Sequence, residues 1–143
     1  MNTRRQFLSL VATGAAAVLI GGCASAPSFS GDPLVGSLTD AGLSTKQAAG
    51  GLGAVMSLAE SKLAPADYKS FTKLMPSSEK YVKVAQDAGV LTTPVRDIQG
   101  LNSAFSKLGL DPNEARGLLG LVSDYAAKRD GEAGRSLVTH VLN

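Results

Sequence analysis

The segment "GLSTKQAAGGLGAVMSLA", residues 42–59, has the pattern of a helix start followed by a helix rich in glycine. Ser44 and Gln47 have capping-box spacing, in which the serine oxygen accepts from a backbone N–H and the longer side chain reaches back. Gly42 stands just before them, where a preceding helix would end in the left-handed conformation that glycine adopts freely. The segment therefore predicts a helix end, a cap and a new helix.

The same pattern recurs 67 residues later as "GLDPNEARGLLGLVSDYA", residues 109–126, with eight of 18 positions identical. Asp111 and Glu114 form a second capping box, and Pro112 occupies the first helical position, where its missing donor costs nothing. Helical spacing places four apolar residues of each copy on one face: Ala48, Leu52, Val55 and Ala59, and Ala115, Leu119, Val122 and Ala126. We expect two related halves built on this internal repeat, 42–59 and 109–126.

The glycines raise the alternative of a nucleotide-binding turn, but that fingerprint needs a strand before its glycines. Here a helix cap and first turn precede Gly51. At 100° per residue, Gly50, Gly53, Gly117 and Gly120 lie nearly opposite the two apolar stripes. We expect these four glycines to allow close packing of a neighbouring helix, so that Gly50→Leu and Gly117→Leu would destabilise the fold. The alternative is a composition that merely tolerates glycine.

The rest of the chain shows helical spacing and no sustained alternation with a period of two. Besides the two repeat helices, helices are expected over five segments: Pro33–Ala41, Pro65–Met75, Ser78–Ala88, Val95–Leu108 and Gly131–Leu142. We predict an all-α fold, a compact bundle of about six helices.

The N-terminal region predicts export. Arg4 and Arg5 precede an apolar run, Phe7–Ile20, which is shorter than the about 20 residues that span a bilayer. "TRRQFL", residues 3–8, resembles the twin-arginine export signal, although Ser9 replaces the usual lysine. An ordinary Sec signal is the alternative. We expect residues 1–22 to be a cleaved signal peptide.

"IGGC", ending at Cys23, resembles the lipobox of bacterial lipoproteins, and Cys23 is the only cysteine. We expect acyl chains on Cys23 to anchor the protein in a membrane. Ala24, rather than Asp, follows the cysteine, which favours the outer membrane, with the protein facing the periplasm. Residues 23–32 are then a lipidated Cys and flexible tether, and 33–143 a single helical domain.

Catalytic, cofactor and metal sites are not predicted. His140 is the single histidine, and no nucleophile elbow or metal-ligand spacing occurs. Without Arg4 and Arg5, the 12 Lys and Arg balance the 12 Asp and Glu, so charge does not favour nucleic acid. Five lysines read as a solvated face, although a lipid-headgroup site is an alternative: Lys62, Lys69, Lys73, Lys80 and Lys83.

"GLSTKQAAGGLGAVMSLAESKL" followed by a Pro-led helix and "KLMP", together with "FSKLGLDPNEARGLLGLVSDYAAKRDGEAGRSL", is similar to the VcgC/VcgE family of uncharacterised bacterial proteins. The similarity covers roughly Leu34–Leu142; it departs from the family over Arg116–Leu119, where bulkier apolar residues are expected. It implies an all-α domain of unknown function in an envelope setting, and no catalytic residue.

The expected function is that of a cell-envelope lipoprotein, not an enzyme, whose helical domain holds an unknown protein partner or supports the envelope. A helical carrier that binds an apolar ligand or lipid is the alternative, and a hydrolase with an unrecognised site is a third. The oligomeric state is not predicted.

Overall fold

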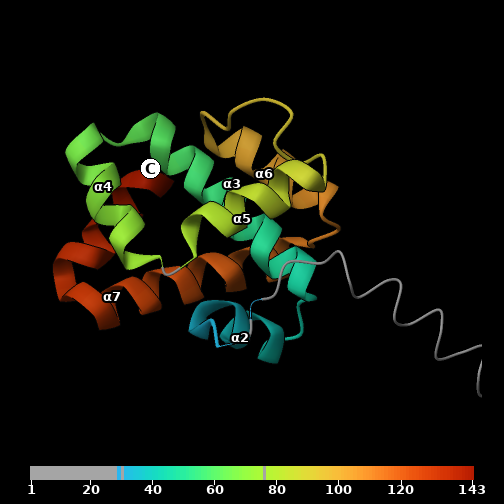
Figure 1. The fold of residues 1–143 in the computed structure, drawn as a ribbon, viewed down its shortest axis with the longest axis horizontal. Helices are drawn as coiled ribbons and strands as arrows, with labels where there is room; N and C mark the ends of the chain where they lie inside the picture. Colours follow the sequence, from blue (N-terminus) through green and yellow to red (C-terminus); the bar gives the residue numbers. More distant parts are fainter. Residues whose placement is uncertain (1–28, 30, 76) are drawn as a thin grey trace, which may run out of the picture.

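The computed structural model describes residues 29, 31–75 and 77–143. These residues form six helices and contain no strand (Figure 1). The all-α prediction is therefore confirmed. The helices are α2 (Pro33–Asp40), α3 (Thr45–Lys62), α4 (Pro65–Leu74), α5 (Ser78–Asp87), α6 (Ile98–Lys107) and α7 (Pro112–Leu142).

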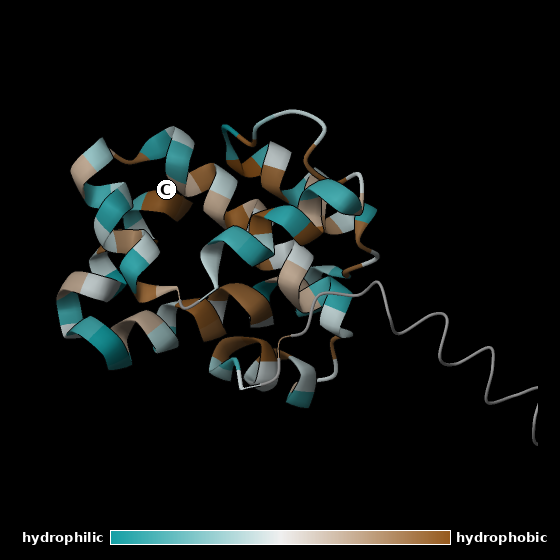
Figure 2. Cartoon of the chain, in the orientation of Figure 1, coloured by the Kyte–Doolittle hydropathy of each residue, from teal (hydrophilic) through white to brown (hydrophobic). Residues whose placement is uncertain are grey.

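Helix α3 lies in the middle of the bundle and contacts each of the other five helices (Figure 1). Its predicted capping box is present: the Gln47 amide N–H donates to Ser44 Oγ over 3.1 Å, and the Ser44 N–H donates to Gln47 Oε1 over 3.0 Å. All residues from 48 to 59 are buried. Figure 2 shows apolar residues on the inner faces of the surrounding helices. An element buried on all sides needs small residues wherever a neighbouring backbone approaches.

The glycines of α3 meet three different neighbours. A Cβ at Gly50 would lie 2.8 Å from Leu108 Cδ2, at the end of α6, and one at Gly51 would lie 2.5 Å from Leu118 Cδ1 of α7. At Gly53 the obstacle is the backbone of α5, because a Cβ there would overlap the carbonyl oxygen of Tyr81. Gly50 and Gly53 thus lie at close helix contacts, as the sequence predicted.

The corresponding prediction for Gly117 and Gly120 is wrong. Both are exposed, and no atom lies within 4 Å of a Cβ built on either. The described residues place α5 over the glycine face of α3, whereas they place no helix over this face of α7. In α7 the buried stripe consists of Leu118, Val122 and Ala126, while Ala115 and Leu119 are only half-buried.

The last helix expected from the sequence is the second part of α7. Asp111 and Glu114 form the predicted capping box. The helix then bends sharply at Asp130 and at Gly131, whose φ of 57° is in the range that favours glycine. After the bend Gly134 contacts the carbonyl group of Ala126, so the two parts of α7 pack tightly.

The close contact between α3 and α5 predicts opposite effects for two matched substitutions. Gly53→Leu should lower the free energy of unfolding by about 1–3 kcal/mol or more, because the backbone of Tyr81 cannot give way as a side chain could. Gly120→Leu, at the exposed repeat position, should raise it by up to about 1 kcal/mol through helix propensity. Chemical denaturation followed by circular dichroism measures both. Equal changes would contradict the packing described.

Candidate functional site

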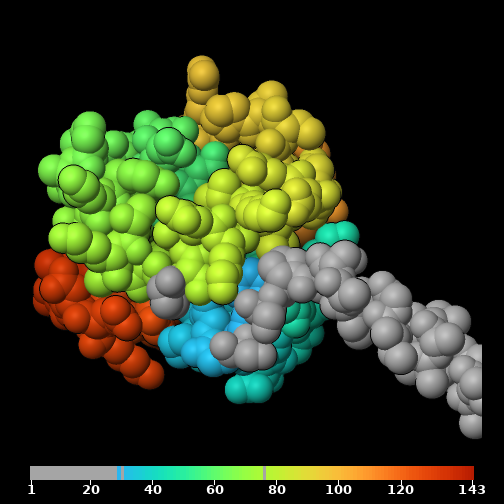
Figure 3. Space-filling model, in the orientation of Figure 1, coloured from blue at the N-terminus to red at the C-terminus, as the bar shows by residue number. Residues whose placement is uncertain are grey.

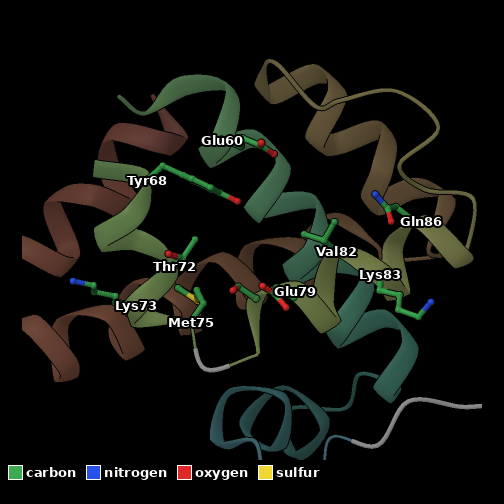
Figure 4. A pocket seen from close by; sticks show the side chains of 10 residues that line it. Glu60, Tyr68, Thr72, Lys73, Met75, Glu79, Val82, Lys83 and Gln86 are labelled. Carbon is green, nitrogen blue, oxygen red and sulfur yellow. The ribbon is translucent and has the colours of Figure 1, made fainter. Parts of the chain in front are cut away.

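An open groove of about 710 Å³ lies between the end of α3 and helices α4 and α5 (Figure 4). A break at Leu63 and Ala64 lets α4 turn back alongside α3, and α4 ends before Met75. The groove is lined by ten residues: Glu60, Tyr68, Thr72, Lys73, Met75, Ser78, Glu79, Val82, Lys83 and Gln86.

The groove combines an apolar floor with charged sides. Met75 is buried, and the side chains of Tyr68 and Val82 are half-buried. Figure 4 shows the Tyr68 side chain pointing toward Glu60, whereas the ammonium groups of Lys73 and Lys83 point away from the centre. Lys83 also forms an exposed ion pair with Asp87 over 3.8 Å.

The Tyr68 hydroxyl is protonated at neutral pH. Partial burial, and then the nearby Glu60 carboxylate, raise the pKa of Tyr68 above its ordinary value. A protonated phenol can donate a hydrogen bond to a ligand, and the carboxylates of Glu60 and Glu79 can accept from a cation. The groove can therefore hold an apolar side chain that is flanked by basic or hydrogen-bonding groups.

A second polar cluster joins the N-terminal segment to the bundle. The buried carboxylate of Asp32 caps α2 by accepting from the backbone N–H groups of Leu34 and Val35 over 3.0 and 3.1 Å. Its other oxygen accepts from the Tyr81 hydroxyl of α5 over 2.6 Å. Phe29 stacks on the Tyr81 ring with the centroids 5.8 Å apart. The folded domain therefore includes Phe29 and Asp32, which the sequence had assigned to the flexible tether.

The other residues singled out in the sequence form no site within the part of the chain that the structure describes. Arg4, Arg5 and Cys23 lie outside the described residues. His140 is exposed near the end of α7. Within residues 29, 31–75 and 77–143, no group of three or more His, Cys, Asp or Glu side chains could hold a metal ion.

Comparison with known families matches residues 11–143 to the family described as protein of unknown function VcgC/VcgE (DUF2780). The chain belongs to the VcgC/VcgE family. The resemblance noted from the repeat segments is therefore confirmed, as is the all-α domain of unknown function. The comparisons with curated proteins and with solved structures found no match. Among the helices that the structure describes in this VcgC/VcgE chain, none combines the length and the hydrophobicity of a membrane span.

Sequence reasoning missed Asp32 as a cap, although a signal was present. Asp32-Pro33 has the same Asp-Pro order as Asp111-Pro112, which was identified as a helix start. The bond from Tyr81 to Asp32 had no such signal, because the two residues are 49 positions apart in the sequence. The residues of the groove likewise come from three helices, and their spacing in the sequence does not bring them together.

The Asp32–Tyr81 contact predicts a loss of stability at alkaline pH. Burial, and then the hydrogen bond to Asp32, strongly raise the pKa of Tyr81 above its value of about 10 in an unfolded chain. Above pH about 10 the unfolded chain loses a proton that the folded chain keeps, so stability falls by up to about 1.4 kcal/mol per pH unit. Below that pH this contribution is fully present.

Tyr81→Phe should remove this part of the slope, while it costs about 1 kcal/mol at neutral pH through the lost hydrogen bond. Urea unfolding between pH 8 and about 11 measures both proteins. If wild type and Tyr81→Phe lose stability in parallel, the contact described is not maintained in solution.

Proposed function

We propose that this VcgC/VcgE chain is an exported lipoprotein, anchored through acyl chains on Cys23, whose helical domain holds a protein partner without catalysing a reaction. The signal and lipobox patterns at Arg4, Arg5 and Cys23 support the export and the anchor. Ala24 supports a location at the outer membrane, facing the periplasm. The groove between α4 and α5 is the surface that carries the proposed interaction.

The lining of the groove favours a protein segment over a lipid. Carboxylates and lysines surround Tyr68, Met75 and Val82, whereas a site for a lipid chain is predominantly apolar. The close contacts of Gly50 and Gly53 leave no space for a ligand along that face of α3. We infer a partner segment with an exposed apolar side chain next to Lys or Arg, whose charge would face Glu60 and Glu79.

We also infer that the two halves arose by duplication of a three-helix unit, with α2, α3 and α4 corresponding to α6 and the two parts of α7. The Leu43 N–H donates to the Leu38 carbonyl over 3.1 Å, and at the same repeat positions the Leu110 N–H donates to Phe105 over 3.0 Å. The bend at residues 130–131 also falls 67 residues after the break at residues 63–64. Helix α5 is then an addition to the first half.

Photocrosslinking in cells tests the groove. Benzoylphenylalanine in place of the half-buried Val82 should crosslink to one discrete partner protein, and Glu60→Lys with Glu79→Lys should abolish that product by reversing the charge of the site. Leu91 is a matched half-buried aliphatic position outside the groove and should give no such product. A Val82 product that survives the charge reversal, or no product, would rule out this surface.

Metabolic labelling tests the anchor. Labelled palmitate should enter the wild-type protein but not Cys23→Ala, because the thiol is the group that accepts the lipid. Wild type should sediment with membranes, and the variant should be released in soluble form. Labelling of the Cys23→Ala variant would refute the lipobox.

A further inference from the structure

The domain holds the N-terminal segment from Phe29 onward. The Asp32 N–H donates to the Phe29 carbonyl over 3.0 Å across a turn, and Gly31 adopts a φ of 82° within it. Stacking of Phe29 on Tyr81 and the 2.6 Å hydrogen bond from Tyr81 to Asp32 fix this turn to α5. Phe29, at the junction of α2 and α5, is therefore the first described residue that is held to the domain.

The distance from this point to the proposed anchor is short. Six residue steps separate Cys23 from Phe29, and a fully extended chain of that length spans about 20 Å. A domain of about 115 residues is roughly 35 Å across. A tether of that length cannot reach around the domain from its far side. The half of the domain centred on Phe29 must then face the surface that holds Cys23.

The segment around α2 carries few charged residues. Residues 31–45 contain no Lys or Arg, although the exposed Lys46 follows directly, and their two acids are the buried Asp32 and the exposed Asp40. We call the exposed residues of this segment the α2 surface. Apart from Asp40 they are uncharged: Gly31, Pro33, Ser37, Ala41, Gly42, Ser44 and Thr45. Loop 91–97 lies at the opposite edge of the molecule from α2 (Figures 1 and 3) and carries the exposed Arg96 and Asp97.

We propose that the α2 surface is the face that the domain presents to the lipid bilayer, while loop 91–97 points away from it. This proposal rests on the lipid anchor at Cys23 proposed above. The partner is the headgroup layer of the anchoring membrane. Because the α2 surface lacks basic residues, the tether and the Phe29–Tyr81–Asp32 contacts set the orientation, and attraction to anionic lipid does not. In Figure 4, α2 lies below the groove between α4 and α5.

Energy transfer to a labelled membrane surface tests this orientation. The chain has no Trp, so Ser37→Trp on α2 and Thr93→Trp in loop 91–97 each introduce a single donor at an exposed position. Each lipidated protein is reconstituted in phosphatidylcholine vesicles that contain a dansyl-headgroup lipid. Transfer from Ser37→Trp should exceed that from Thr93→Trp several-fold. Equal transfer, or more transfer from Thr93→Trp, would overturn the proposal.

Two controls examine the cause of the orientation. A flexible Gly-Ser insertion of about 20 residues after Ala24 lengthens the tether and should bring the two signals together. Replacement of part of the phosphatidylcholine by phosphatidylglycerol should change neither signal, because the α2 surface has no cationic group of its own and only the single Lys46 borders it. A difference that persists with the long tether, or that appears only with anionic lipid, would show adhesion rather than tethering.

A thiol-coupled form separates failure of this inference from failure of the anchor. The mature chain from Cys23 can be attached to a maleimide lipid in the same vesicles through its only thiol. The same difference between the two Trp positions is expected there. If cells do not acylate Cys23 but the coupled protein is oriented as described, only the proposed function fails. If acylation occurs but the coupled and native proteins show no preferred face, only the orientation fails.

Discussion

The arrangement of the bundle depends on the contact between Gly53 of α3 and the backbone of Tyr81 in α5. No side chain larger than hydrogen fits between the two helices at that point, so glycine at position 53 sets how closely they approach. The same contact determines where the Tyr81 hydroxyl and ring lie. From there Tyr81 binds Asp32 and stacks on Phe29, so a packing constraint in the core also fixes the N-terminal junction.

Much of the fold is predictable because the residues that cap a helix end lie within a few positions of one another in the sequence. Ser44 with Gln47 and Asp111 with Glu114 form the expected capping boxes, and Gly42 and Gly109 have the positive φ values expected after a helix. The neighbours that surround each helix, by contrast, come from distant parts of the sequence. The two repeat segments have the same glycine spacing, but only α3 lies in the centre of the bundle, so the prediction held for its glycines and failed for Gly117 and Gly120.

The candidate site was less predictable than the fold. Lys73 and Lys83 read in the sequence as parts of a solvated face, and in the structure they are exposed. Their position around Met75 and Tyr68 follows from the turn between α3 and α4 and from the packing of α5 on α3. The junction at Phe29 depends on a contact between residues far apart in the chain, which helical spacing does not encode.

Native-state hydrogen exchange tests the central position of α3 most directly. The amides of residues 50–58 should be the slowest in the protein and should exchange only through global unfolding, because every residue of that span is buried. The amides around Gly117 and Gly120 should exchange through smaller openings, since that face of α7 is exposed. Equal or slower exchange in α7 than in α3 would contradict a fold organised around α3.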